Sequence, residues 1–199
     1  MTGIEDVLDF WFGGLREGEP APPERFAFWF GGAETTDRQI RVRFAADVDR
    51  AGAGGYDYWR ASPQGTLALL LLLDQFPRNI HRSSPRAYTL DGKAREICLA
   101  GLDEGQDRQL ITIQRAFFYL PLEHAEDIAL QQRSVAAFAE LLRQTPGPLR
   151  ETCRSFLDYA ERHRAIIDRF GRFPHRNSSL SRISTAEEEA FLSEPGSSF

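Results

Sequence analysis

Apolar residues recur at alternating spacings of four and three along much of the chain, which is the pattern of an α-helix with one buried face. The longest such stripe, within residues 149–170, consists of Leu149, Cys153, Phe156, Ala160, His163, Ile167 and Phe170. A second stripe, within residues 124–142, consists of His124, Ile128, Gln131, Val135, Phe138 and Leu142. The pattern predicts two long amphipathic helices and places one histidine on the buried face of each.

Start and stop signals predict further helices before these two. Ser62–Pro63 is an N-cap followed by proline at the first helical position, so a helix should begin there and end at Phe76, before Pro77. Ser84–Pro85 repeats the start signal for a helix that runs toward Leu102. Shorter helices are predicted at residues 4–12, from about residue 37 with a stripe of Ile40, Phe44 and Val48, and behind a capping box of Thr185 and Glu188.

Signals for β-strands are poor, because the chain has no sustained alternation of apolar and polar residues and no Asn-Gly or Asp-Gly pair between two such stretches. Helices that follow one another through short loops pack as antiparallel pairs, so stacked helix pairs are the predicted all-α architecture. Residues 67–73 are apolar on every side and predict a central helix that is covered all round. Residues 1–199 are expected to form a single helical domain, with 193–199 as a loose tail.

Composition and charge change this picture mainly by what they exclude. The net charge is −5, which argues against nucleic acid as a partner. The longest apolar run is far shorter than the ~20 residues that a membrane span needs. Cys98 and Cys153 each fall within a helical pattern, so we expect both to be reduced and buried, in a chain without a secretory leader. We therefore expect a cytoplasmic protein with no membrane partner.

Two short motifs, far apart in the chain, share the residues Phe-Pro-Arg-Asn. The first motif is Phe76-Pro77-Arg78-Asn79, and the second, with a histidine inserted, is Phe173-Pro174-His175-Arg176-Asn177. They contain the only two asparagines of the chain, and each follows a long predicted helix. Asparagine also suits a plain turn, because it tolerates left-handed backbone, so a purely structural role stays open for each. We nevertheless predict that the two motifs meet in space.

Both motifs lie in locally basic surroundings within an acidic protein. Residues 162–182 contain six arginines and one acid, Asp168. Residues 75–90 contain three arginines and no acid. Guanidinium groups bind carboxylate or phosphate in a bidentate manner, and asparagine adds neutral donors and acceptors. We therefore predict a binding site for a small anionic ligand. Its predicted lining consists of Arg78, Asn79, His163, Arg172, His175, Arg176 and Asn177.

His124 is the candidate for acid–base chemistry. It lies on a buried stripe, where a polar ring needs a partner, and Asp127 follows three residues later on the same predicted helix face. A carboxylate beside an imidazole fixes its tautomer, so His124 and Asp127 are the predicted catalytic pair, with a neutral ring near neutral pH. The alternative is structural, with Asp127 supporting a helix N-terminus and His124 bonded to a backbone carbonyl.

Other chemistries find less support in the sequence. The histidines lack the compact spacing of a zinc motif, so no metal is expected. No GxSxG, Walker or Rossmann pattern occurs, so neither a common nucleophile nor a nucleotide cofactor is expected. Glu123 and Glu126 follow Pro121 and are interpreted as acids that complement the dipole of a helix start. Asp74 should be partly buried and paired with Arg78, which lies one turn ahead.

Three longer blocks resemble a known bacterial family. They are LLLLDQFPRNIHR (Leu70–Arg82), RAFFYLPLEHAEDIALQ (Arg115–Gln131) and HRAIIDRFGRFPHRN (His163–Asn177). Together with VLDFWFG near the start and STAEEEAFL near the end, they resemble the domain-of-unknown-function family numbered nine-two-four over nearly the whole chain. The resemblance implies an all-helical fold of the tetratricopeptide-like superhelical class, and it leaves the activity open. Ala125 departs from the serine that the family often has after the histidine.

Two functions stay open, as do catalysis and the oligomeric state. One is a pocket that binds, and in its fuller form processes, a small molecule with a carboxylate or phosphate group. The other is a tetratricopeptide-like interaction module that clamps the terminal carboxylate of a peptide in a helical groove. Burial separates the two, because inward-facing residues suit a small ligand and residues along an open groove suit a peptide. The inward stripes that carry His124 and His163 favour the pocket.

Overall fold

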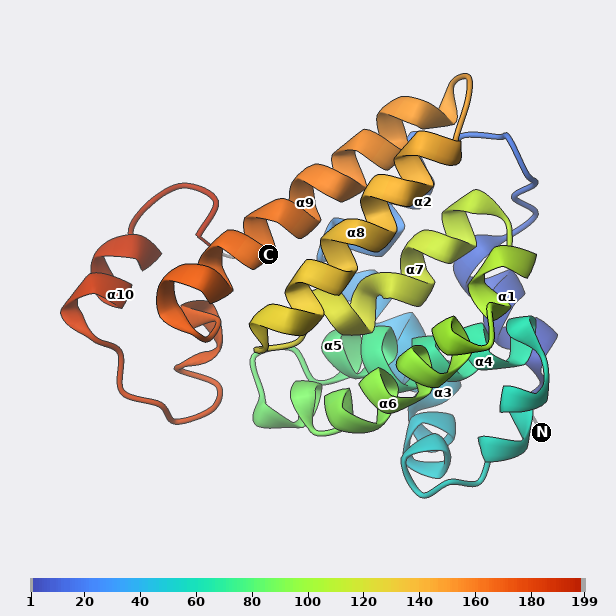
Figure 1. Cartoon of the computed structure of the whole chain (residues 1–199). Helices are drawn as coiled ribbons and strands as arrows, with labels where there is room; N and C mark the ends of the chain where they lie inside the picture. The colour runs from blue at the N-terminus through green and yellow to red at the C-terminus, as the bar shows by residue number, and fades with distance from the viewer. Residues whose placement is uncertain (1, 198–199) are drawn as a thin grey trace.

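The helical periodicity of the sequence becomes a structure without strands in the computed structural model, which describes residues 2–197 (Figure 1). The α-helices are α1 (Ile4–Phe12), α2 (Pro23–Phe30), α3 (Glu34–Gly52), α4 (Pro63–Leu70), α5 (Phe76–Ile80), α6 (Asp91–Asp103), α7 (Thr112–Glu123), α8 (Ile128–Gln144), α9 (Leu149–Phe170) and α10 (Ala186–Leu192). Shorter turns are the 3-10 helices η1 (Asp57–Ala61), η3 (Pro85–Tyr88), η4 (Gln106–Gln109) and η5 (Pro174–Arg176), and the π-helical turn η2 (Leu71–Gln75). The all-α class is confirmed.

The C-terminal half is built on three antiparallel helices. Helices α7, α8 and α9 run up and down beside one another through the short connections 124–127 and 145–148 (Figure 1). The apolar stripe of α9 is turned inward, so that Leu149, Cys153, Phe156 and Ala160 are all buried. Burying each large apolar side chain contributes about 1.5–3 kcal/mol, and this is what holds an otherwise polar helix to its neighbours.

The central helix, formed by α4, η2 and α5, is covered on all sides, as the apolar run predicted. Every residue from Leu67 to Leu73 is buried. Aromatic side chains of the first helix pack against it and against α7: the ring centroid of Trp11 lies 5.4 Å from that of Phe76 and 5.8 Å from that of Phe117 on α7. Tilted and edge-to-face rings of this kind add to the burial energy. They anchor the N-terminal helices to the centre of the molecule.

The central helix does not end before Pro77, which corrects the prediction. Proline lacks an N–H group, so a regular α-helix would leave the carbonyl of Leu73 without a partner. The chain widens instead into η2, where the N–H of Phe76 donates to the carbonyl of Leu71. Pro77 then occupies the first turn of α5, where no N–H is required. Packing on all sides outweighs the local stop signal, and the π turn carries Asp74 and the residue after it into the protein interior.

Two other helix boundaries differ from the predicted ones. Ser84–Pro85 starts only the turn η3, and the next helix, α6, begins at Asp91. Residues 124–127 connect two helices instead of lying within one, because the carboxylate of Asp127 accepts the N–H of Leu130 and caps α8. The N-cap at Ser62 and the capping box of Thr185 and Glu188 are confirmed.

Beyond α9 the chain forms a C-terminal arm, residues 171–197, which is drawn in red at one side of Figure 1. Gly171 ends α9 in the left-handed conformation, with φ at 70°. Phe173 then packs with Ile166 and Ile167 in a small second core. In the predicted loose tail, the Ser197 hydroxyl donates to the Leu192 carbonyl at 3.2 Å, and residues 198–199 lie outside the described residues.

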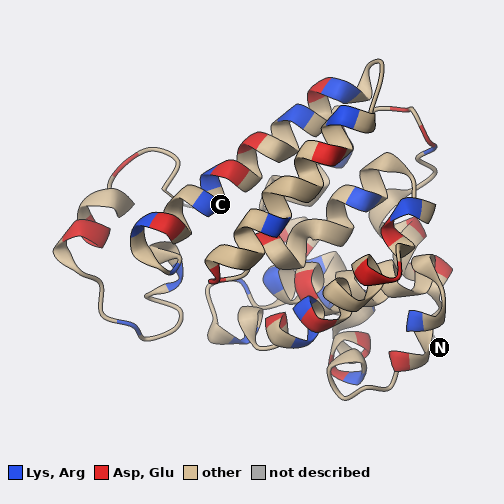
Figure 2. Ribbon diagram, in the orientation of Figure 1, with Lys and Arg blue, Asp and Glu red and all other residues tan. Residues whose placement is uncertain are grey.

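The remaining expectations concern the cysteines and the surface. Cys98 and Cys153 are free and buried, as predicted, and burial raises the pKa of both thiols. Within residues 2–197, none of the helices combines the length and the apolar character that crossing a membrane requires. Basic and acidic residues are interspersed along α9 (Figure 2), so this outward-facing helix presents no patch of a single sign.

Candidate functional site

A cluster of buried and half-buried charged and aromatic residues forms where the central helix meets the end of α7, α9 and the C-terminal arm. We call it the polar cluster. Its members are Asp74, Arg78, Tyr88, Asp91, Glu123, His124, His163 and Arg176. It contains four of the residues predicted to form a site, and it brings them together from segments that are distant in the sequence.

Asp74 and His124 are the closest pair in the cluster. His124 is the C-cap of α7, and its Nδ1 lies 2.8 Å and 3.0 Å from the two carboxylate oxygens of Asp74 on the π turn. The amide of Gln75 donates to the same carboxylate at 2.6 Å. Because Asp74 accepts at Nδ1, the neutral ring carries its proton on Nδ1, and its Nε2 presents a lone pair.

The charge states of this pair follow from burial and from Arg78. Burial alone would raise the pKa of Asp74, but Arg78 and His124 outweigh it and hold that pKa well below its usual range. Burial and Arg78 lower the pKa of His124, although Asp74 opposes them. The pair is therefore an aspartate beside a neutral imidazole near neutral pH, in line with the neutral ring predicted for His124.

The outer nitrogen of His124 has no bonded partner among the described residues. Among residues 2–197, no protein group makes a hydrogen bond to its Nε2, and this atom is not fully buried. The side chain as a whole is 15% exposed, whereas that of Asp74 is 2% exposed. A histidine oriented by a buried carboxylate, with its second nitrogen unbonded, has the hydrogen-bonding arrangement of a general base or acid.

The two Phe-Pro-Arg-Asn motifs meet beside this pair, as predicted, through their arginines. The guanidinium carbon of Arg78 lies 5.6 Å from the ring centroid of Tyr88, and that of Arg176 lies 4.8 Å from the same centroid. Both arginines also face Asp91, at 2.8 Å for Arg78 and 3.8 Å for Arg176. One ring and one carboxylate thus join two segments that lie nearly a hundred residues apart.

The two arginines differ in how fully they are bonded. Arg78 donates to both oxygens of Asp91, at 2.8 and 2.9 Å, and to the carbonyl of Asp74. Arg176 makes a single hydrogen bond within the described residues, to the carbonyl of His124 at 3.1 Å, and its buried Nε has no acceptor. Burial and the neighbouring Arg78 lower the pKa of Arg176 to about 10, so it is still cationic at neutral pH. Arg176 is the cation with bonding capacity to spare.

Glu123 and His163 form a second buried pair in the cluster. The Nδ1 of His163 donates to the carbonyl of Tyr159 at 2.9 Å and lies 3.4 Å from a carboxylate oxygen of Glu123. Burial, together with Asp74, raises the pKa of Glu123 to about 8, so its carboxyl group is largely protonated at neutral pH. Burial lowers the pKa of His163 to about 3, which keeps that ring neutral. Both side chains are therefore neutral polar groups.

The predicted pairing of Asp127 with His124 is wrong. The two residues lie on either side of the break between α7 and α8, and Asp127 is exposed and caps α8. The spacing of three residues implies a shared face only within one helix. Asp74, predicted to pair with Arg78, takes the orienting place and also lies 3.2 Å from that arginine. Glu123 likewise ends a helix and does not complement a helix start.

Four of the predicted ligand-binding residues have other surroundings. Asn79 donates to Asp37 at 2.9 Å, and Asn177 donates to Ser184 at 3.0 Å and to Glu188. Arg172 donates to both oxygens of Glu188. His175 packs against Phe173, with ring centroids 5.5 Å apart, and burial and Arg176 lower its pKa to about 4. The first three are therefore engaged with residues outside the polar cluster.

Sequence reasoning missed Tyr88 and Asp91, which bridge the two arginines. Tyr88 ends η3 and Asp91 begins α6, so both lie at element ends within a stretch that was predicted to be one continuous helix. No pattern of spacing distinguishes them from other surface residues. A helix break predicted between Tyr88 and Asp91 would have drawn attention to these two residues, but the sequence analysis predicted none there.

Comparisons with known proteins agree on the fold and give no activity. The family model described as a bacterial protein of unknown function (DUF924) matches residues 7–196. The solved structure of a protein of unknown function from Agrobacterium tumefaciens is 37% identical, with 96% of each chain covered and a TM-score of 0.80. Among curated proteins none matches. The function therefore has to be argued from the polar cluster itself.

Proposed function

This chain belongs to the bacterial DUF924 family of unknown function, and within that family we propose that its polar cluster binds a small carboxylate- or phosphate-bearing molecule and exchanges a proton with it. His124, oriented by Asp74, is the proton-exchanging group in this proposal. Arg176 contacts the anionic group of the ligand. The proposal names a binding site with acid–base capacity, and the reacting bond of the ligand is left open.

The observation that carries the proposal is a neutral His124 whose Nε2 has no bonded partner within residues 2–197 and whose other nitrogen is bonded to a buried aspartate. Neutral imidazole accepts a proton at Nε2, and the adjacent carboxylate stabilises the imidazolium that results. Arg176 supports the anionic half of the proposal, because it is bonded to the backbone carbonyl of His124 and its charge acts on the His124 ring. A guanidinium with unused N–H groups is the side chain best suited to a carboxylate or phosphate.

Burial favours a small molecule over the peptide clamp. Arg176 is 5% exposed and His163 is 4% exposed, so these groups face inward. A peptide that binds along a helical groove would need its contact residues in an open row.

The proposal is tested by titrating isotope-labelled protein with inorganic phosphate and with acetate while following backbone and histidine signals. We expect saturable shifts at residues 124 and 173–177 in the native protein. Arg176→Gln should weaken binding about 10–100-fold, because hydrogen bonds to charged groups contribute about 1.5–3 kcal/mol each. Arg154→Gln is the matched control, since Arg154 is 51% exposed on α9 and lies away from the cluster.

His124→Gln separates binding from proton exchange. This variant should retain anion affinity within a few-fold, while the pH dependence of binding that comes from the imidazole disappears. Two results would contradict the proposal: the absence of saturable shifts near His124 with either anion, and equal affinities in Arg176→Gln and Arg154→Gln. In the second case the arginine would be structural.

A further inference from the structure

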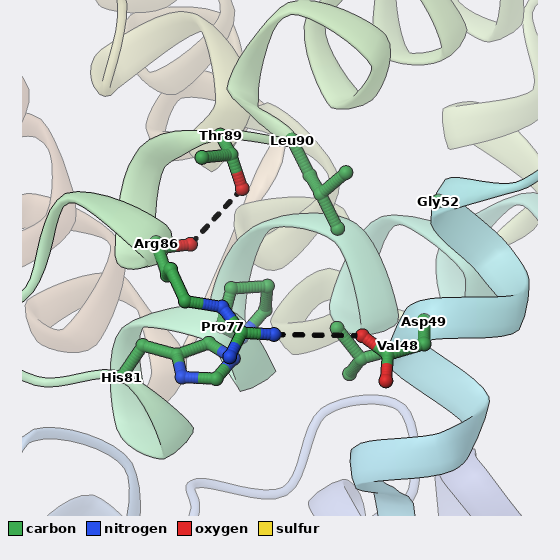
Figure 3. A pocket seen from close by; sticks show the side chains of 8 residues that line it. All are labelled: Val48, Asp49, Gly52, Pro77, His81, Arg86, Thr89 and Leu90. Atoms are coloured by element: carbon green, nitrogen blue, oxygen red, sulfur yellow. Dashed lines mark hydrogen bonds and ion pairs between the residues drawn. The ribbon is translucent and has the colours of Figure 1, made fainter.

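A cavity of about 220 Å³ opens on another face of α5, outside the polar cluster (Figure 3). It is lined by Val48, Asp49, Gly52, Pro77, His81, Arg86, Thr89 and Leu90. Pro77 faces this cavity while the next residue, Arg78, is bonded to Asp91 in the polar cluster, since neighbouring helical residues point in different directions. None of the residues proposed to act with His124 lines it, so the cavity is a separate feature of the molecule.

The cavity combines an apolar wall with a polar rim. Pro77, Val48 and Leu90 supply the apolar surface. Figure 3 shows the guanidinium of Arg86 between the ring of His81 and the carboxylate of Asp49. A volume of about 220 Å³ exceeds the roughly 10–15 Å³ that one water molecule needs by the same measure, so the cavity has room for a small organic ligand.

Arg86 and Asp49, the two charged residues on the rim, interact only weakly with each other. The nearest atoms of Arg86 and Asp49 are 3.9 Å apart, which is too far for a hydrogen bond. Their side chains are 64% and 74% exposed, and within residues 2–197 neither donates or accepts a further side-chain hydrogen bond. Burial and the adjacent Arg86 lower the pKa of His81, so its ring is a neutral hydrogen-bonding group. One cation, one anion and one neutral ring therefore border the same opening.

From this arrangement we propose that the cavity binds a small zwitterion, namely an α-amino acid with an aliphatic side chain. Its carboxylate contacts Arg86 and His81, its ammonium group contacts Asp49, and its side chain packs against Pro77, Val48 and Leu90. A simple anion of the same size would leave its negative charge facing Asp49, and a simple amine would face Arg86. A ligand with both charges satisfies both ends of the rim, which is the basis for discriminating it from either analogue.

The experiment compares three ligands that share one side chain: leucine, isovalerate without the ammonium group, and isopentylamine without the carboxylate. Each is titrated into isotope-labelled full-length protein up to about 10 mM, a range in which even a site of ~1 mM affinity fills. We expect saturable shifts from leucine at residues 48–52 and 77–90. We expect at least about tenfold weaker binding of both analogues, because each lacks one charge-assisted contact.

Two pairs of variants identify the site. Asp49→Asn and Arg86→Gln should each weaken leucine binding about tenfold or more. Their controls, Asp158→Asn and Arg38→Gln, change exposed residues outside the cavity and should bind as the native protein does. All four positions are exposed, so the variants are expected to fold.

The proposal is overturned if leucine produces no saturable shifts at these residues, or if isovalerate binds as tightly as leucine, which would indicate a plain anion site. Equal leucine affinity in Asp49→Asn and Asp158→Asn would also overturn it. These outcomes are independent of the acid–base site, since that test reads out phosphate and acetate at residues 124 and 173–177.

Discussion

The two Phe-Pro-Arg-Asn motifs share their residue types and end in different local structures. The first motif continues a helix, because Pro77 occupies the first turn of α5 directly after a π turn. The second motif begins a new 3-10 turn, because Gly171 has already ended α9 and the arm has changed direction. The difference lies in the surroundings, since the first motif belongs to a helix that is buried all round and the second to an arm with a small core of its own.

In both motifs the asparagine and the arginine make different kinds of contact. In each, the asparagine donates to a carboxylate that also binds an arginine: Asp37 accepts from Asn79 and Arg82, and Glu188 accepts from Asn177 and Arg172. In each, the remaining arginine is directed to Tyr88 and Asp91. The asparagines therefore fix the motifs in place, and the arginines are what the motifs present to the polar cluster.

Replacing Arg78 and Arg176 in turn should give the largest difference in stability between the two motifs. Arg78→Met leaves the buried Asp74 without its bonded cation and removes both hydrogen bonds to the half-buried Asp91, and we expect the free energy of unfolding to fall by about 3–5 kcal/mol. Arg176→Met removes one hydrogen bond and two aromatic contacts, and we expect a loss of about 1–2 kcal/mol. Urea unfolding measures both.

Equal losses in the two variants would break the comparison. They would mean that Arg176 neutralises the acids of the cluster as much as Arg78 does, and that it is no freer to bind a ligand. A double variant adds a check, because arginines that share Asp91 and Tyr88 should show non-additive losses.

Glu123, a buried member of the polar cluster, should make the free energy of unfolding depend on pH between about 4.5 and 8. Its pKa is raised from 4.5 to about 8, so between those values the folded protein keeps a proton that the unfolded chain releases. Stability from this group is therefore present below about pH 4.5 and is lost as pH rises toward 8, by up to about 1.4 kcal/mol per pH unit.

Glu123→Gln removes that titration while preserving the shape of the side chain. Relative to the native protein, the variant should gain about 2–4 kcal/mol between pH 5 and pH 8, as measured by urea unfolding at each pH. Parallel stability curves for the two proteins over this range would show that Glu123 is ionised in the folded state. The neutral character assigned to that side of the cluster would then be wrong.

The sequence predicted the helical class and the buried stripes because these depend on a periodicity that packing only reinforces. It also placed His163 inward, and it paired Asp74 with Arg78 from their spacing within one turn. Ser62 and the Thr185–Glu188 box were readable because a cap is a local interaction.

The failures came where a distant contact overrides a local signal. Pro77 did not end its helix, since burial on all sides and a π turn compensate for its missing N–H group. Asp127 did not orient His124, because the helix boundary falls between them and Asp74, fifty residues earlier, reaches the ring instead. Tyr88 and Asp91 were not found, since their role depends on two arginines that lie nearly a hundred residues apart in the chain.

The anchoring asparagines provide the finest test of the comparison. Asn79→Ala removes a hydrogen bond of 2.9 Å to a buried carboxylate, which keeps Arg82 as its other partner. We expect a loss of about 1–2 kcal/mol in the global free energy of unfolding. Asn177→Ala removes the contacts with Ser184 and Glu188, while Glu188 keeps Arg172.

The bonds lost in the two variants are similar, but the consequences should differ in extent. The C-terminal arm is held by a small core of its own around Phe173, so weakening its anchor favours local opening before global unfolding. We expect Asn177→Ala to speed amide exchange several-fold at residues 172–192 and to leave the urea midpoint nearly unchanged. Asn79→Ala should shift the midpoint instead, because α5 belongs to the central helix and has no independent way to open.

If both variants act only on the midpoint, the arm unfolds with the rest of the protein. In that case the second motif would be as firmly fixed as the first, and Arg176 would have no more freedom than Arg78 to meet a ligand.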